Sequence, residues 1–278
     1  MAVLKELIRH DKPLRTDSAA VYPYNAGLER KYRFTSRFGE EVLLHRADKA
    51  NNIIYLPRGL CPVGDNDNRS EGAPAYFPKC PEPRPHQVPL FEEVTKLIEK
   101  GLSGLVVAQT GFGKTILGYR AAYVAQVKTL VITTKDDIYK QWIAGAKQFL
   151  GLEDHEIGEI RGDKCQVVDT KFCVAMIHSL TKEGKYPDWV FKDFGLVIFD
   201  ECHRVPADQF QSAVWMIPAR LRIGLSATPE RSDGKELIVY AHIGPVRAKA
   251  EAQLIVPKVL LFNSGWECPK VLRTDRVT

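Results

Sequence analysis

The sequence reads Ala108-Gln-Thr-Gly-Phe-Gly-Lys-Thr115 between an apolar run at 104–109 and a run with helical spacing at 114–126. A strand, a glycine turn and a helix in this order form the phosphate-binding loop of a parallel α/β sheet. Gly111 and Gly113 allow the backbone to curl so that its N–H groups point at phosphate oxygens, and the helix adds the positive end of its dipole. This context argues against a glycine turn with a chance lysine and predicts a triphosphate site.

Two side chains of this loop are expected to hold the nucleotide. Lys114 reaches the β and γ phosphates, and the hydroxyl of Thr115 is a ligand for Mg²⁺. The loop therefore predicts ATP and Mg²⁺ as the bound cofactors.

A second strand end carries two adjacent carboxylates, in Asp200-Glu-Cys-His203 after the apolar run 195–199. Neighbouring anions repel each other and lose hydration unless a cation or water compensates them. With a phosphate loop in the same sheet, we expect Asp200 to hold Mg²⁺ through its water shell and Glu201 to orient and deprotonate the attacking water. Taken alone, the pair also fits a helix N-cap.

The region from Pro85 onward alternates between helix and strand periods. Helical spacing at 91–98 precedes the first strand, and Thr134 is expected to cap a later helix. Further short apolar strands are expected at 128–133, 172–177, 195–199 and 221–225. This repetition predicts a parallel sheet with helices on both faces, which binds ligands at the carboxyl ends of its strands.

Composition narrows the class of protein. The 278 residues are 45% apolar and 26% charged, as in a globular protein of one large or two smaller domains. No run approaches the roughly 20 apolar residues of a membrane span, and the N-terminus lacks a secretory signal. A net charge of +5 permits a nucleic-acid partner without requiring one. The six cysteines lack the spacing of a zinc site.

The segment 58–85 is rich in turn residues and proline, which predicts a linker between two domains. We place a small α+β or β-rich accessory domain at 1–80, the nucleotide-binding lobe at 81–256 and the start of another linker at 257–278. Within the first domain we expect a short helix or strand at 3–9 and strands at 32–38, 41–45 and 53–56.

Basic and aromatic residues interleave in the N-terminal domain, at Arg30, Lys31, Tyr32, Arg33, Phe34, Arg37 and Phe38. Such a mixture can hold a nucleic-acid backbone and stack on bases. The alternation itself favours a strand with a solvated basic face and a buried aromatic face. A DNA-binding role for 1–80 is therefore one of two open interpretations.

Three segments together identify a family resemblance. The phosphate loop, Asp200-Glu-Cys-His203 and Ser226-Ala-Thr228 resemble motifs I, II and III of the DExH-type superfamily 2 helicases, in the family's order. Segments at 84–87, 133–142 and 177–180 resemble the adenine-reading segment, motif Ia and the next nucleic-acid-contacting segment. Over about 84–260 the chain is similar to the branch that contains XPB and phage helicases of recombination and fork remodelling such as UvsW.

The resemblance implies a role for individual residues. The residues expected to bind the nucleotide are Arg84, Gln87, Thr110, Gly111, Phe112, Gly113, Lys114 and Thr115. Among them, Gln87 is expected to form a hydrogen bond with the adenine edge. The residues that couple nucleotide state to nucleic-acid grip are His203, Ser226 and Thr228. The contacts to a strand backbone are Thr134, Lys135, Gln141 and Ser179.

Each of these groups has a plain alternative. From the residues alone, His203 is also a salt partner, and Ser226-Ala-Thr228 is also a polar turn. Thr134 and Lys135 also fit the start of a helix. Trp142 is expected in the core, because aromatic residues at helical spacing are usually buried.

The family's motor consists of two RecA-like lobes, and the second supplies an arginine finger. After Pro257 only 258–262 resembles a strand, and no second βα series follows. We therefore expect an N-terminal portion of a longer helicase that is nearly inactive by itself, since the finger contributes about three to five decades of rate in related systems.

The implied function is an ATP-dependent DNA helicase or translocase. It would move on single-stranded or branched DNA, largely independently of sequence, in recombination, repair or replication, in the cytoplasm of a bacterium or a phage-infected cell. A duplex translocase subunit of a restriction or remodelling complex and a non-catalytic nucleic-acid-binding module are the alternatives. The motifs at 200–203 and 226–228 count against a small-molecule kinase.

Overall fold

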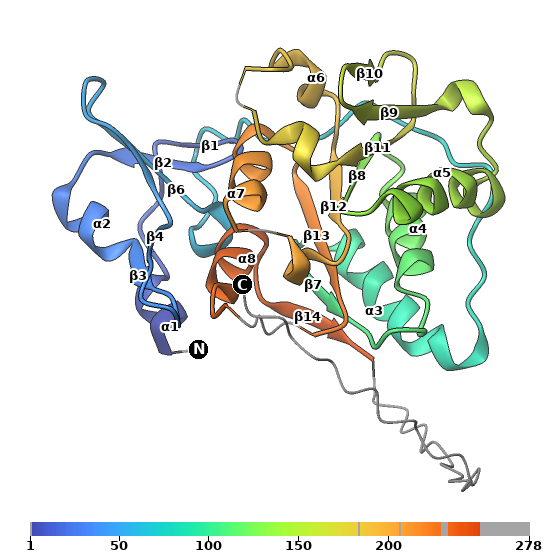
Figure 1. Cartoon of the computed structure of the whole chain (residues 1–278), viewed down its shortest axis with the longest axis horizontal. Helices are drawn as coiled ribbons and strands as arrows, with labels where there is room; N and C mark the ends of the chain where they lie inside the picture. The colour runs from blue at the N-terminus through green and yellow to red at the C-terminus, as the bar shows by residue number, and fades with distance from the viewer. Residues whose placement is uncertain (1, 183, 206, 229–232, 251–278) are drawn as a thin grey trace, which may run out of the picture.

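An eight-stranded sheet forms the centre of the molecule (Figure 1). The computed structural model describes residues 2–182, 184–205, 207–228 and 233–250, so the linker predicted at 257–278 and the run 258–262 lie outside the described residues. The strand order is β10-β9-β11-β8-β12-β13-β7-β14, and every pairing is parallel except β10 with β9. The strands are β7 Gly104–Val107, β8 Thr129–Thr133, β9 Ile157–Arg161, β10 Lys164–Gln166, β11 Phe172–Met176, β12 Leu196–Phe199, β13 Leu221–Ser226 and β14 Val246–Lys249.

Helices cover both faces of this sheet. Alternate strand residues point to opposite sides, so Val106, Val131 and Ile198 belong to one apolar cluster while Leu105 and Leu130 belong to the other. The first cluster includes α3 Val88–Glu99, α4 Lys114–Ala125 and α5 Asp136–Leu150. The second includes α6 Trp189–Lys192, α7 Ala207–Met216 and α8 Glu236–Ile243. The predicted RecA-like parallel sheet with helices on both faces is confirmed.

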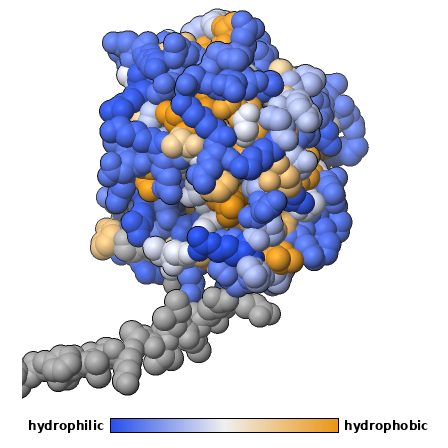
Figure 2. Space-filling view, turned by 90° about the vertical axis from the view of Figure 1, so that its right-hand side faces the viewer, coloured by the Kyte–Doolittle hydropathy of each residue, from blue (hydrophilic) through white to orange (hydrophobic). Residues whose placement is uncertain are grey.

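Short 3₁₀ helices complete the lobe, at η2 Pro85–Gln87, η3 Asp154–Glu156, η4 Ile177–Leu180 and η5 Cys202–Arg204. The side of the molecule on which α4 and α5 lie is mainly hydrophilic, with small hydrophobic areas between (Figure 2). Within the described ranges, no helix combines the length and the apolarity that crossing a membrane requires.

Two local expectations were wrong. Lys135, not Thr134, is the N-cap of α5, and its side chain makes no capping hydrogen bond. The strand expected at 32–38 is only β3 Arg33–Thr35, because Tyr32 is the C-cap of α2 and the chain turns after Ser36, whose carbonyl accepts from Gly39 N at 3.1 Å. The antiparallel hairpin of β9 and β10 has no counterpart in the sequence-based assignment.

The N-terminal residues form a mixed module beside this lobe (Figure 1). Its four-stranded antiparallel sheet has the order β1-β2-β6-β5, and β3 pairs with β4 in a separate hairpin. The elements are α1 Ala2–Leu7, β1 Arg15–Thr16, β2 Ala20–Pro23, α2 Ala26–Lys31, β4 Glu41–Leu43, β5 Arg46–Asp48, β6 Ile53–Leu56 and η1 Arg58–Leu60. A small α+β unit at this end of the chain therefore exists as expected.

The module and the lobe share one continuous core. Tyr22 and Ile54 of the module belong to the same apolar cluster as Phe210 and Ile243 of the lobe. The two approach closely at Gly59, where an added Cβ would lie 2.5 Å from Ala241 O of α8. The domain boundary at residue 80 stays a prediction. Before that boundary, Ser70 already forms an isolated β-bridge with Ala219 of the lobe.

Two buried arginines join the module to the lobe through backbone carbonyls. Arg58 donates from Nη1 to Asp17 O at 2.9 Å and from Nη2 to Ala219 O and, at 3.0 Å, Arg220 O. The carbonyls of Ala219 and Arg220 immediately precede β13. A positive guanidinium surrounded by carbonyl oxygens satisfies donors and acceptors that burial would otherwise leave unpaired.

Arg222 makes the second junction from within β13 and is fully buried. It donates to Val214 O at 3.0 Å and Ile217 O at 2.9 Å at the end of α7, and to His242 O at 3.1 Å in the last turn of α8. Its bond to Ser18 O at 2.8 Å reaches the module. A cation at two helix C-termini compensates the negative ends of their dipoles.

Arg58→Ala should therefore destabilise the chain by about 3 kcal/mol, because several buried carbonyls lose their donors at once. Urea unfolding followed by circular dichroism measures this change. The matched control is Arg15→Ala, whose side chain is 45% exposed and pairs with Asp17 across 3.4 Å. That substitution should change the free energy of unfolding by less than about 1 kcal/mol. Equal small losses for both variants would contradict the assigned role of Arg58.

Candidate nucleotide-binding site

The glycine turn after β7 adopts the conformation that a phosphate loop needs. Gly111 and Gly113 have φ values of 86° and 97°, in the left-handed region. An added Cβ at Gly113 would also lie 2.5 Å from Gln87 Nε2, whereas one at Gly111 would meet nothing within 4 Å. Gly111 is thus required for its backbone angle, and Gly113 for both its angle and its lack of a side chain.

The segment before α3 braces the loop. Gln87 is buried, and its amide donates from Nε2 to Phe112 O at 2.5 Å while its Oε1 accepts from Arg84 N at 2.8 Å. The ring of Phe112 meets His86 edge-on with centroids 5.4 Å apart. The predicted adenine-reading segment and the phosphate loop are therefore in direct contact, although they are distant in sequence.

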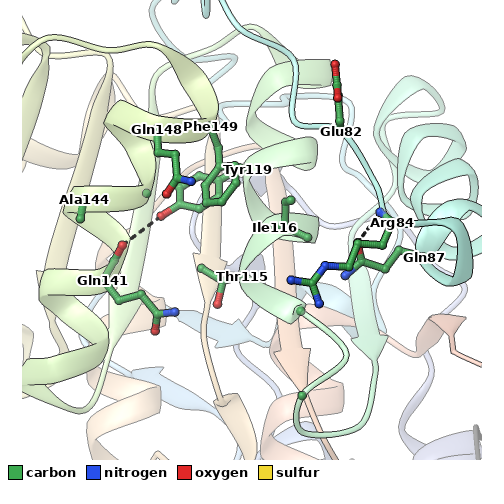
Figure 3. A pocket seen from close by; sticks show the side chains of 13 residues that line it. Glu82, Arg84, Gln87, Thr115, Ile116, Tyr119, Gln141, Ala144, Gln148 and Phe149 are labelled. Atoms are coloured by element: carbon green, nitrogen blue, oxygen red, sulfur yellow. Dashed lines mark hydrogen bonds between the residues drawn. The ribbon is translucent and has the colours of Figure 1, made fainter.

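A cavity of about 590 Å³ opens beside the loop. In Figure 3, Arg84 and Gln87 line one side, Thr115, Ile116 and Tyr119 come from α4, and Gln141, Gln148 and Phe149 come from α5. Its volume falls within the usual range of small-molecule sites. Arg84, Gln87, Gly111, Gly113 and Thr115 of the predicted nucleotide set line this cavity, and Thr110 is exposed in the same loop.

The first carboxylate, Asp200, lies at the carboxyl end of β12 and is only 5% exposed. Its Oδ2 accepts a hydrogen bond from Trp142 Nε1 at 2.8 Å. Burial raises the pKa of the Asp200 carboxyl above its usual value, and the indole N–H partly opposes that rise. Asp200 is therefore a charged group whose burial costs free energy unless a cation compensates it.

The second carboxylate, Glu201, lies against the phosphate loop. Its backbone has a φ of 47°, which is strained for a residue with a side chain. Its Oε1 lies 3.2 Å from Lys114 Nζ, and its Oε2 lies 3.4 Å from His203 Nδ1. The expectation that the acidic pair and the glycine loop meet at one edge of the sheet is confirmed by this contact.

A chain of polar contacts runs from Glu201 through His203 to the end of β13. His203 Nδ1 lies 2.9 Å from Ser226 Oγ, whose hydroxyl donates to Thr228 O. Because that hydroxyl has a single proton, Nδ1 is the donor in the histidine–serine bond. Ser226 O in turn accepts from Ala108 N at 3.0 Å, next to the phosphate loop. The structure thus brings the three predicted coupling residues together, with Thr228 contributing its carbonyl.

Comparison with known proteins settles the family. Residues 81–231, more than half of the chain, match the ResIII family model, described as "Type III restriction enzyme, res subunit". The chain belongs to the ResIII family. The glycine turn at 111–113 and the acidic pair at 200–201 both lie within the matched residues.

The relatives of this ResIII chain are helicases. It is 33% identical over 170 residues to the DNA 3'-5' helicase XPB of Kineococcus radiotolerans, covering 60% of this chain and 30% of that protein. It is 32% identical over 158 residues to the probable helicase D10 of Escherichia phage T5, covering 57% and 32%. The chain spans about a third of the length of these relatives. The resemblance to XPB-like helicases is confirmed.

A solved structure supports the fold. The UvsW helicase of bacteriophage T4 superposes with a TM-score of 0.56 at 18% identity, covering 81% of this chain and 92% of that chain. At this identity, the likeness establishes a shared arrangement of elements and nothing more.

The donor atoms at the strand ends suit a hard cation. Asp200 is a buried carboxylate, Glu201 Oε2 is buried without a hydrogen-bond donor, and Thr115 carries a hydroxyl on the lining of the 590 Å³ cavity. Mg²⁺ prefers such oxygen ligands and usually takes one or two carboxylates together with substrate phosphates. Among the described residues, no three His, Cys, Asp or Glu side chains lie close enough together to hold a metal ion by themselves.

The four predicted nucleic-acid contacts do not lie together. Thr134 and Lys135 follow β8 and surround a small cavity of about 80 Å³ with Asp200 and Glu201. Gln141 instead lines the nucleotide cavity (Figure 3).

Ser179 is only 3% exposed, and its Oγ accepts from Gly162 N at 2.9 Å in the β9–β10 turn. Its side chain is therefore occupied inside the fold, which corrects the expectation of a surface contact.

Trp142 makes a contact that the motifs do not indicate. The residue is buried as expected, and its indole N–H donates to the carboxylate of Asp200. A buried indole N–H requires a hydrogen-bond acceptor, so a tryptophan expected in the core also predicts a buried acceptor beside it. The sequence cannot show which acceptor it finds, because the two residues are 58 positions apart.

Asp200→Asn should raise the thermal stability of the chain without nucleotide at neutral pH. Because folding raises the pKa of Asp200, its charged form costs stability above the folded-state pKa, and this cost disappears as pH falls through that value. The stabilisation by Asn should therefore shrink toward acid pH, as measured by thermal unfolding across a pH series. Asp163→Asn, at a fully exposed carboxylate, is the control and should show no such trend. A gain that is constant with pH would contradict the burial argument.

Proposed function

We propose that this chain is the ATP-binding lobe of an ATP-dependent DNA helicase or translocase, an enzyme that hydrolyses ATP to move on DNA. The observation that supports it most directly is the 3.2 Å contact between Lys114 Nζ and Glu201 Oε1. It joins a phosphate-binding lysine and a candidate general base at the ends of two strands of one sheet. Membership of the ResIII family and similarity to XPB-like helicases agree with this function.

The proposed reaction is attack of water on the γ-phosphorus. The backbone N–H groups of the glycine turn and Lys114 bind the β and γ phosphates. Mg²⁺, held by Thr115 and through water by Asp200, supplies neutralisation of phosphate charge when it is bound. Glu201 accepts a proton from the attacking water as the bond to the β–γ bridging oxygen breaks, releasing ADP and inorganic phosphate.

The ion pair between Lys114 and Glu201 has a consequence for this sequence of events. In this contact Lys114 neutralises Glu201. When Lys114 transfers to the phosphates, Glu201 loses its cation and becomes free to act as a base. The contact of Glu201 Oε2 with His203, and of His203 with Ser226, then connects this change to β13.

We propose DNA as the polymer on which the lobe acts. Lys135 is exposed at the carboxyl edge next to Asp200 and Glu201, where a phosphate backbone can reach it. Contacts of this kind hold a strand through phosphates and give binding that is largely independent of sequence. A preference for single-stranded or branched DNA is part of the proposal.

Duplex translocation without strand separation is the second candidate, because the matched family is described by a restriction enzyme subunit. A translocase of that kind displaces a third strand from a triplex but does not separate a duplex. Strand-displacement and triplex-displacement assays on the motor with both lobes distinguish the two candidates.

Two substitutions test the hydrolytic assignment. Lys114→Ala should weaken binding of a fluorescent ATP analogue about ten- to hundred-fold, because a charge-assisted contact is lost. In the motor with both lobes, Glu201→Gln should bind the analogue and slow single-turnover ATP hydrolysis by about two to four decades. Lys140→Ala, on an exposed lysine of α5, is the control for both. Normal hydrolysis by Glu201→Gln would refute the role of Glu201 as general base.

The DNA contact is tested by salt dependence. Lys135→Ala should weaken binding of a labelled oligonucleotide and reduce the slope of log K against log salt by about one charge. Lys140→Ala lies on the same helix, pairs with Asp136 and should leave the slope unchanged. If the two variants behave alike, Lys135 is not on the DNA path.

A further inference from the structure

Trp142 connects helix α5 to the carboxylate proposed to hold the metal. Its side chain is fully buried, and its Nε1–H donates to Asp200 Oδ2 at 2.8 Å. Most buried polar groups pair with backbone or with neutral side chains. Here the acceptor is an acidic side chain that has itself been removed from water, so the bond is charge-assisted and directional.

The surroundings fix the position of the indole. The ring of Tyr119 meets it edge-on at 4.7 Å, and Phe172 stacks on it at 6.2 Å. An added Cβ at Gly118 would lie 2.4 Å from Trp142 Cη2, so α4 leaves room for the large ring at this point only by having a glycine. The indole therefore has little freedom to move away from Asp200.

The backbone of Trp142 is held as well. The hydroxyl of Tyr119 donates to Trp142 O at 2.8 Å. Since Tyr119 belongs to α4, which begins at Lys114, the helix of the phosphate loop and the helix carrying the indole are fastened to each other. Both the ring and the main chain of Trp142 are thus positioned relative to the nucleotide site.

We propose that Trp142 is a positioning residue for the metal site: its N–H holds Asp200 Oδ2, fixes the carboxylate rotamer and reserves Oδ1 for the hydration shell of Mg²⁺ bound to the nucleotide. The inference rests on the proposed function. It goes beyond packing, because packing alone is satisfied by any ring of similar size. Residues that orient metal ligands in this way typically change metal affinity about ten- to hundred-fold when they are lost.

Trp142→Phe tests this role, because it retains an aromatic ring and removes the N–H. Binding of a fluorescent ADP analogue is measured as a function of Mg²⁺ concentration, and again in EDTA. The Mg²⁺ concentration that gives half of the maximal gain in affinity for the ADP analogue should rise about ten-fold. The affinity for the analogue in EDTA should stay unchanged.

The control is Phe172→Leu, which alters the same aromatic cluster without touching Asp200 and should leave the Mg²⁺ dependence unchanged.

A double-mutant cycle separates positioning from general destabilisation. In an Asp200→Asn background, Trp142→Phe should add no further change in Mg²⁺ dependence, because the two residues act through one contact. An additional ten-fold loss in that background would overturn the proposal. So would an unchanged Mg²⁺ midpoint in Trp142→Phe while the unsubstituted chain binds the Mg²⁺–nucleotide. Failure of the unsubstituted chain to bind any nucleotide would instead refute the proposed function.

A measurement on the unsubstituted chain remains decisive if Trp142→Phe does not fold. The indole ¹H–¹⁵N resonance of Trp142, assigned by replacing the other tryptophans one at a time, reports directly on its hydrogen bond. It should move when Mg²⁺ is added to the ADP complex and return when EDTA removes the metal. A resonance that does not respond to Mg²⁺ would contradict the proposal.

Discussion

The contact between Lys114 and Glu201 depends on one constraint, the parallel direction of β7 and β12. Parallel strands present their carboxyl ends at a single edge, so the loop after one and the acidic pair after the other meet there. The central strand β13 separates them and contributes Ser226 at the same edge. A cation from one strand end and an anion from another thereby form a site that no single segment of the chain contains.

The two carboxylates are compensated to different degrees, because Glu201 has a cation beside it and Asp200, among the described residues, does not. Lys114 approaches the glutamate, while the aspartate relies on an indole N–H in a buried position that raises its pKa. A fold optimised for stability alone would not bury the carboxylate of Asp200. Its burial is understandable where a bound cation supplies the missing charge, since functional sites commonly keep features that cost stability.

The sequence predicted those features that short segments determine. The glycine turn, the acidic pair and the apolar strands carry local signals, and the structure contains each of them. Contacts between distant segments were not predictable: the Ser179 hydroxyl turns toward Gly162, and Trp142 reaches Asp200. Gln141 and Trp142 are neighbours in α5 but face different sides, because successive helical residues are rotated by about 100°. The segment 133–142, which resembles a single motif, therefore contains one residue that lines the cavity, Gln141, and one that is buried in the core, Trp142.

Arg58 and Arg222 have a consequence for the mechanics of a two-lobed motor. They fasten the N-terminal sheet to β13, α7 and α8 through carbonyls on both sides of the shared core. In the proposed motor, the sheet would therefore move with the lobe as one body. A fluorophore on the turn between β5 and β6 would accordingly report rotation of this lobe from a position remote from the nucleotide site.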